Sequence, residues 1–205
     1  MKPHQISLLL AIAAGFASAI TQVRAATIFY DQGLWQIGIS VVSTVPFDND
    51  LIGGQTNYTA AGLTESGVHF SSSELYVEPT AFYYLSPYLF DGSGLLTITL
   101  PTGTTAVGMN VISQTGGANL ISLNAILTNS GTVSSSFSGV AYNPTFWGIT
   151  SSDPISTITI NASSTWLGLD NFSIGTVPEP STCAKLAVGF GSLFIFRRRN
   201  QSAAL

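Results

Sequence analysis

The sequence predicts an all-β fold, an antiparallel β-sandwich or jelly roll that occupies residues 26–176. Short runs of β-branched and aromatic residues recur along this stretch, and Gly, Ser, Asn and Pro separate them roughly every 8–12 positions. No apolar stripe with helical spacing is visible there. A β-helix is the alternative, but no repeat of fixed period supports it.

The expected strands follow one another in short segments. In chain order they are 27–30, 39–47, 68–71, 75–77, 95–100, 106–113, 120–128, 132–137, 147–151, 155–161 and 172–175. Apolar and polar residues alternate over 96–100, which places the apolar side chains on one face. Over 155–160 the alternation slips once, as at an edge strand or a bulge. The segment 129–131, Asn-Ser-Gly, predicts a hairpin turn.

Residues 1–25 have the pattern of a secretory signal peptide. Lys2 precedes an apolar run over 6–20, and Val23-Arg24-Ala25 offers a cleavage site of the A-x-A kind, with Ala17-Ser18-Ala19 as an alternative. This run is predicted to form a signal helix. A retained membrane anchor is the other interpretation, although the run is shorter than the ~20 residues that a spanning helix prefers.

The C-terminal part combines three features in a fixed order. A proline-containing motif is followed by an apolar run over 184–196 and then by a basic cluster; the motif and cluster residues are Val177, Pro178, Glu179, Pro180, Ser181, Thr182, Arg197, Arg198 and Arg199. The prolines favour an extended, accessible segment. The apolar run predicts a short hydrophobic helix, just long enough to span a bilayer with snorkelling ends. The arginines should then stay on the cytoplasmic side.

This C-terminal part resembles the PEP-CTERM sorting signal of bacterial exported proteins. The resemblance implies a sorting signal at 177–200 with a short transmembrane helix, a tail at 201–205, and recognition of Pro178, Glu179 and Pro180 by an exosortase, a membrane protease. A plain C-terminal membrane anchor is the alternative. Segments 57–62, 67–70, 146–151 and 169–175 also resemble a body type of PEP-CTERM proteins, which implies a jelly roll without an assigned activity.

The charge distribution excludes several classes of partner. All six Lys and Arg residues lie in the end segments, and residues 26–176 hold nine carboxylates and no Lys or Arg, a formal charge of −9. Such a body has no cation with which to neutralise the phosphates of a nucleic acid. It also lacks an Arg or Lys to clamp a phosphorylated substrate. The single cysteine, Cys183, allows no intramolecular disulfide.

Few catalytic groups are present in the body. Its one histidine, His69, lies in a strand-like run without a Gly-x-Ser-x-Gly motif, so a surface histidine is the preferred interpretation over a catalytic base. Zinc sites of the common kinds need several His or Cys residues. A glycosidase would need two converging carboxylates, from Glu65, Glu74 and Glu78. We therefore expect a protein without enzymatic activity.

A calcium site is compatible with an acidic, cation-free domain, because carboxylates and carbonyls suffice for Ca²⁺. The segment Asp48-Asn49-Asp50 begins like an EF-hand loop but lacks its later ligands; Asp48 and Asp50 could still bind Ca²⁺ with a distant partner such as Asp170. The alternative is a turn in which these side chains cap their own backbone. No other cofactor is expected.

An aromatic segment at 82–90 offers a binding hypothesis. Its tyrosines Tyr83, Tyr84 and Tyr88 could stack on sugar rings and donate hydrogen bonds from their hydroxyls. Packing over the end of the core is the alternative for these rings, and Trp147 and Trp166 are expected to be packed rather than exposed.

Together these features predict an exported protein that is tethered to the inner membrane as a precursor and then released to the cell envelope or the extracellular matrix. Its expected partners are an exosortase, the membrane through the C-terminal helix, and exopolysaccharide. The alternative is a carbohydrate-binding module, with or without calcium.

Overall fold

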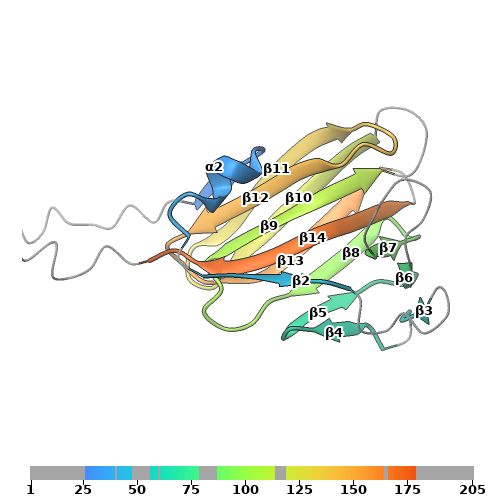
Figure 1. The fold of residues 1–205 in the computed structure, drawn as a ribbon, viewed down its shortest axis with the longest axis horizontal. Helices are drawn as coiled ribbons and strands as arrows, with labels where there is room; N and C mark the ends of the chain where they lie inside the picture. The colour runs from blue at the N-terminus through green and yellow to red at the C-terminus, as the bar shows by residue number, and fades with distance from the viewer. Residues whose placement is uncertain are drawn as a thin grey trace, which may run out of the picture.

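The computed structural model describes residues 26–39, 41–47, 56–59, 61–78, 87–113, 119–163 and 166–178. The two flanking helices expected from the sequence, in the signal peptide and in the apolar run at 184–196, lie outside the described residues. In the described part of the chain, two antiparallel sheets pack face to face as two layers (Figure 1). The antiparallel sandwich that the sequence predicts is therefore confirmed.

The larger sheet, sheet A, has the strand order β1-β12-β9-β14-β7-β6-β3, and β2 pairs with the second half of β14. Its strands are β1 (Ala26–Phe29), β2 (Val41–Val45), β3 (Thr56–Asn57), β6 (Leu75–Glu78), β7 (Tyr88–Asp91), β9 (Ala106–Ser113), β12 (Thr145–Ser151) and β14 (Leu167–Thr176).

The smaller sheet, sheet B, has the order β11-β10-β13-β8-β5-β4. Its strands are β4 (Leu63–Glu65), β5 (Val68–Ser71), β8 (Leu95–Thr99), β10 (Asn119–Leu127), β11 (Gly131–Gly139) and β13 (Ile155–Ala162). The expected hairpin turn at 129–131 joins β10 to β11, and Gly131 has a φ of 93°, a left-handed conformation that glycine adopts without strain.

Four elements were not expected from the sequence. Three are the strands β3, β4 and β7, and the fourth is α2 (Gln32–Gln36), the one helix among the described residues. Strands of two to four residues are too short to show a clear alternation. The helix has five residues and begins at Asp31, whose Oδ1 accepts a hydrogen bond from the Leu34 N–H at 2.8 Å.

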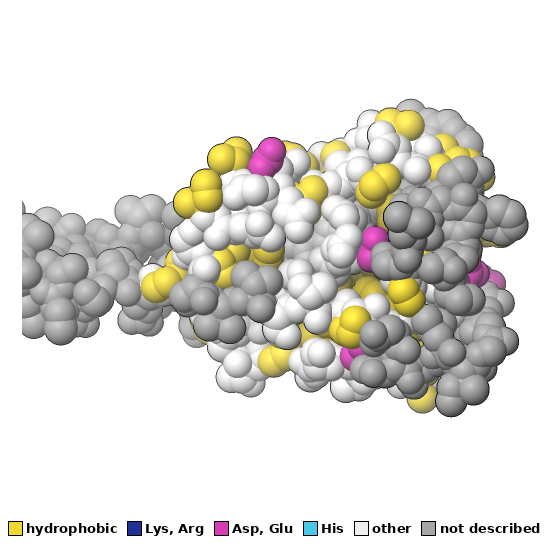
Figure 2. Space-filling view, in the orientation of Figure 1, with side chains coloured by type: hydrophobic (Ala, Val, Ile, Leu, Met, Phe, Trp, Pro, Cys, Tyr) yellow, Lys and Arg dark blue, Asp and Glu magenta, His cyan; other side chains and the backbone are white. Residues whose placement is uncertain are grey.

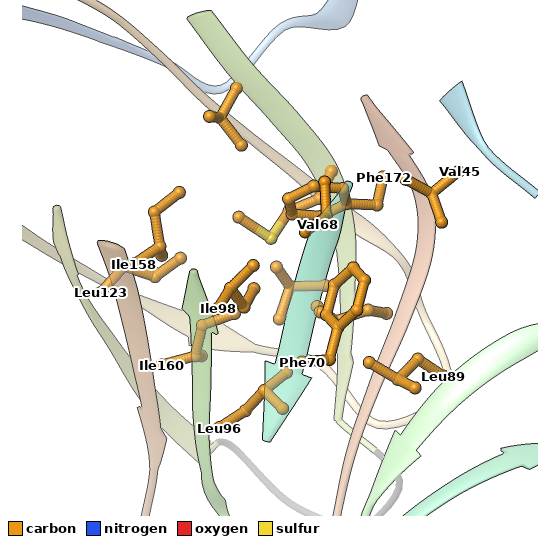
Figure 3. Close-up of a cluster of buried hydrophobic side chains, with 14 of the residues drawn as sticks. Val45, Val68, Phe70, Leu89, Leu96, Ile98, Leu123, Ile158, Ile160 and Phe172 are labelled. Atoms are coloured by element: carbon orange, nitrogen blue, oxygen red, sulfur yellow. The ribbon is translucent and has the colours of Figure 1, made fainter. Parts of the chain in front are cut away.

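The core lies between the sheets and is almost entirely aliphatic and aromatic. Figure 3 shows Phe70 of β5 and Phe172 of β14 pointing toward one another from opposite sheets. Their ring centroids are 5.2 Å apart at 80°, and Phe47 packs on Phe70 at 5.4 Å. Edge-to-face pairs of this kind add stabilisation beyond the area they bury.

Helix α2 packs on the outer face of sheet A, over β12 and β1 (Figure 1). Its anchor is Trp35, which is 1% exposed and whose Nε1–H donates to the Ile149 carbonyl at 3.3 Å. The ring rests on Gly108 and Gly148, where any Cβ would lie within 3.0 Å of it. These two glycines therefore make the space that lets the helix cover this end of the sheet.

Strand β14 changes its neighbours at a bulge. Its first residues pair with β7 and its last residues with β2, while the register against β9 shifts between Asp170 and Ser173. Asn171 stands at the shift with a φ of 51°. The extra residue in the bulge turns Phe172 into the core and leaves Asp170 at the outer face.

Candidate functional site

Three aromatic side chains lie together at the β6–β7–β14 end of sheet A. The Phe90 ring contacts Trp166 edge-on, at 5.8 Å and 87°, and contacts Tyr76 at 6.0 Å and 39°. Their neighbours Leu89, on β7, and Leu75, on β6, point into the core, so Phe90 and Tyr76 point away from it. We call Trp166, Phe90 and Tyr76 the aromatic row.

The aromatic row is graded in exposure. Phe90 is 8% exposed, Tyr76 is half-buried, and Trp166 is 51% exposed. The Trp166 ring is therefore in contact with a buried neighbour while about half of the residue stays open to solvent. The expectation that Trp166 is packed like Trp147 is therefore wrong, whereas Trp147 is 1% exposed as expected.

A carboxylate and a phenol lie beside the aromatic row on the same two strands. Glu78 and Tyr88 face each other across β6 and β7, and the Tyr88 hydroxyl donates to Glu78 Oε2 at 2.5 Å. Tyr88 is only 3% exposed. In this conformation it orders Glu78 by a charge-assisted hydrogen bond instead of presenting its own ring.

Asp91 ends β7 and turns toward the interior. It is 1% exposed; its Oδ1 accepts from the Ser72 hydroxyl, from the Ser93 N–H at 3.0 Å and from the Ser93 hydroxyl at 2.8 Å. Its Oδ2 is buried without a hydrogen-bond partner. Asp91 thus ties the end of sheet A to the start of β8, at the cost of one unsatisfied oxygen.

Asp170 lies on the outer side of the bulge in β14. It is 9% exposed; its Oδ1 accepts from the Asn171 N–H at 2.7 Å, and its Oδ2 accepts from Asn171 Nδ2 at 3.2 Å. Across the ladder it stands opposite Asn110 of β9. The carboxylate thus caps the bulge through its own neighbour in the chain.

The outer face of sheet B has a different chemistry. Directly paired residues form two uncharged rows that are rich in hydroxyl groups; one row contains Ser71, Thr97, Thr159, Asn124 and Ser134, and another contains Thr64, His69, Thr99, Thr157, Ile126 and Thr132. No Asp, Glu, Lys or Arg among the described residues points from this face. His69 lies in the second row, where its Nδ1 is 2.8 Å from the Thr64 hydroxyl, as expected for a surface histidine.

Several residues predicted to act at a site lie outside the described residues. These are Tyr83, Tyr84, Asp48, Asp50, Glu179, Pro180, Ser181, Thr182, Arg197, Arg198 and Arg199. Of the predicted sorting motif, Val177 and Pro178 are described, and the Val177 N–H donates to the Thr105 hydroxyl at 2.7 Å. The motif therefore begins directly where β14 ends.

The described residues contain neither a metal-binding cluster nor a membrane-spanning helix. No three His, Cys, Asp or Glu side chains lie close enough together there to hold a metal ion. The part of the chain that is described also contains no helix with the length and apolar character needed to span a membrane. The predicted calcium ligands Asp48 and Asp50 and the predicted hydrophobic helix at 184–196 lie outside the described residues.

Comparisons with known proteins give only distant likenesses. No protein-family model and no curated protein matches the chain. Among solved structures, the chain is similar to the CBM22-1–GH10 modules of Clostridium thermocellum xylanase 10B, with a TM-score of 0.39, 13% identity, and coverage of 64% of this chain and 30% of that one.

The family 11 carbohydrate-binding module of C. thermocellum Lic26A-Cel5E gives a TM-score of 0.36 at 11% identity, over 69% of this chain and 99% of that one. TmCBM61, solved with β-1,4-galactotriose, gives 0.33 at 14%, over 53% and 88%. The chain spans about a third of the length of the xylanase structure. At TM-scores this low, these likenesses carry no argument about a ligand of this chain.

Proposed function

We propose that this chain is an exported, non-catalytic β-sandwich protein that binds a polysaccharide through the aromatic row. One observation carries the proposal: the half-exposed ring of Trp166 is fixed by an edge-on contact with Phe90. The CH faces of a sugar ring stack on such an aromatic surface, while its hydroxyl groups need polar neighbours. The Glu78 carboxylate on β6, which is held in place by the Tyr88 hydroxyl on β7, would accept hydrogen bonds from these sugar hydroxyls.

The negative charge of the body indicates which polysaccharides it can bind. The stretch 26–176 has nine carboxylates and no Lys or Arg, so its field repels sulfated, phosphorylated and uronic-acid chains. A neutral polysaccharide carries no such penalty. We therefore propose a neutral glycan as the ligand, with its sugar ring against Trp166.

The proposed absence of catalysis rests on the chemistry of the candidate groups. His69 contacts Thr64 on the face of sheet B, whereas Glu78 lies on sheet A and contacts Tyr88. The Asp91 oxygen that is bonded to serines is buried. These groups each make structural contacts, and a histidine base on one sheet cannot serve a carboxylate on the other.

Calcium and sorting stay proposals that rest on the sequence. The predicted calcium site joins Asp48 and Asp50 to Asp170; the Asp170 carboxylate is nine-tenths buried and accepts from Asn171, so a metal would share it with the bulge. The PEP-CTERM-like tail supports export, a membrane-tethered precursor and processing by an exosortase. Because β14 runs straight into Val177 and Pro178, the proposed cleavage motif follows the body without a linker.

Affinity electrophoresis of the chain through gels containing neutral polysaccharides tests the binding proposal. Trp166→Ala should weaken retardation by a factor of roughly 30, as expected for the loss of a central aromatic contact worth about 2 kcal/mol. Tyr30→Ala is the matched control, because Tyr30 is 53% exposed and contacts Phe137 elsewhere. Equal retardation of the Trp166 variant and the wild-type chain would remove the proposal.

Fractionation of native cells with intact-mass measurement tests the sorting proposal separately. A mature species that begins near Ala26 and ends near Pro178 to Pro180 is expected. A full-length chain retained in the inner membrane would mean that the tail is an anchor only.

A further inference from the structure

The edge strands of the two sheets differ greatly in length. The strands that pair on one side only, among the described residues, are β1, β2, β3, β4 and β11. The first four contain between two and five residues, whereas β11 contains nine. Short edge strands are one of the ways in which proteins prevent sheets from joining edge to edge. Strand β11 is too long to be protected in this way.

Strand β11 also lacks three other common protections, namely charge, proline and a bulge. Its sequence, Gly-Thr-Val-Ser-Ser-Ser-Phe-Ser-Gly, contains no charged residue and no proline. All nine residues pair with β10 in one continuous register, so no bulge bends the strand away. The outward-facing side chains Thr132, Ser134, Ser136 and Ser138 are small and exposed.

The inner side of β11 holds the strand firmly in the sandwich. Val133 and Phe137 pack against the core cluster, and the Ser135 hydroxyl accepts a hydrogen bond from Trp147 Nε1 at 2.8 Å. A strand anchored in this way presents its edge backbone groups in a fixed, extended geometry. It therefore loses little conformational entropy when it pairs with a further strand.

We propose that β11 pairs antiparallel with β11 of a second copy of this chain, which joins the two copies of sheet B into one continuous sheet. A two-fold axis through the middle of the strand places each edge N–H opposite a C=O of the other copy. The strand carries no charge that such an arrangement would bring against itself. The neutral rows on sheet B would continue across the joint. This inference does not depend on polysaccharide binding.

Cysteine cross-linking of the full chain tests the pairing, because Cys183 is the one native cysteine and can be replaced by serine. Single cysteines at Thr132, Ser134, Ser136 and Ser138 would be tested alone and in pairwise mixtures. Paired residues on neighbouring antiparallel strands have Cα atoms about 5 Å apart, within the range of a disulfide.

The matched control is Ser122→Cys, which lies on the same face of sheet B, on β10, directly paired with Ser136. In the proposed dimer the two copies of Ser122 are separated by three strand spacings, roughly 14 Å, which is too far for a disulfide. Disulfide-linked dimers are expected from one or more of the β11 positions and not from Ser122. Adding Ser134→Lys to a Ser136→Cys chain should lower the dimer yield at least tenfold, because charge on the edge opposes pairing.

The proposal is overturned if no β11 position cross-links at any chain concentration. It is overturned equally if Ser122→Cys cross-links as well as the β11 variants, since contact through the face or random collision would then explain the dimers. Circular dichroism of each variant verifies that the sandwich has folded before cross-linking.

Discussion

The contact between Trp35 and Gly148 allows a double-mutant cycle whose sign can be predicted. A Cβ at Gly148 would lie 2.7 Å from Trp35 Cδ1 and 2.9 Å from Cγ. Trp35 is 1% exposed and hydrogen-bonded to Ile149, so the ring cannot retreat without losing both its burial and its bond. We expect Gly148→Ala to lower the free energy of unfolding by about 1–3 kcal/mol, the usual cost of overpacking.

The second arm of the cycle removes the indole. Trp35→Ala alone should cost about 3–5 kcal/mol. In that background the closest contacts of the alanine at Gly148 are gone, the next being Phe146 at 3.0 Å, and glycine is itself unfavourable in a strand by roughly 0.5–1 kcal/mol. The same Gly148→Ala change should then be neutral or stabilising.

Urea unfolding of the four chains, followed by circular dichroism, measures the cycle. In thermal unfolding, each kcal/mol corresponds to about 2–4 °C for a domain of this size. An equal cost of Gly148→Ala with and without Trp35 would refute the reasoning, because the alanine would then act through the strand and not through the indole. A coupling of 1 kcal/mol or more would show that α2 is docked on the sheet through this contact.

Two further predictions concern the core and the calcium proposal. Phe70→Ala should lower the free energy of unfolding in urea by about 3–5 kcal/mol, because the Phe70 ring is fully buried between Phe47 and Phe172. The control, Thr99→Ala at an exposed position, should change this free energy by no more than about 0.5 kcal/mol. Similar losses from both variants would contradict the assignment of Phe70 to the core. If calcium binds as predicted, millimolar CaCl₂ should raise the unfolding temperature relative to EDTA, and Asp170→Asn should abolish the rise; equal temperatures in both buffers would remove the calcium proposal.

The parts of the fold that the sequence predicts well are those marked by a local run of apolar and β-branched residues or by turn residues. The expected ranges 68–71 and 106–113 coincide with β5 and β9, and the hairpin at Gly131 was expected from its turn residues. Each of these signals is local, because a strand with one buried face has a period of two. The same rule fails for β14, whose expected range began at 172 although the strand begins at Leu167.

The reason for that failure is the bulge. The residue inserted at Asn171 reverses the facing of the side chains, so that Leu167 and Leu169 before it and Phe172 after it all point into the core. A strict alternation does not describe such a strand. The helix α2 was missed for a different reason, since five residues are too few for a helical stripe; the Asp31 cap was its one local signal.

The candidate site was harder to predict, because its geometry depends on contacts between distant residues. The aromatic segment at 82–90 includes Phe90 of the aromatic row, but Tyr88 is buried against Glu78, and the exposed ring of the row is Trp166, 76 positions after Phe90 in the chain. Only the pairing of β7 with β14 brings these rings together. The unsatisfied Oδ2 of Asp91 likewise has no signature in the sequence.

Because the body carries charge of one sign only, we expect added salt to stabilise the fold. The stretch 26–176 holds carboxylates only, so its residues form no ion pairs with one another that salt could weaken. Figure 2 shows acidic side chains spaced over a largely neutral surface, and their mutual repulsion opposes folding. Between 0.01 M and 0.15 M NaCl the screening length falls from about 30 Å to about 8 Å.

The unfolding temperature should therefore rise over this range, and Glu74→Gln, which removes an exposed carboxylate, should reduce the rise. A fall in unfolding temperature with added NaCl would mean that attractive charge pairs, formed with the basic end segments, outweigh the repulsion within the body.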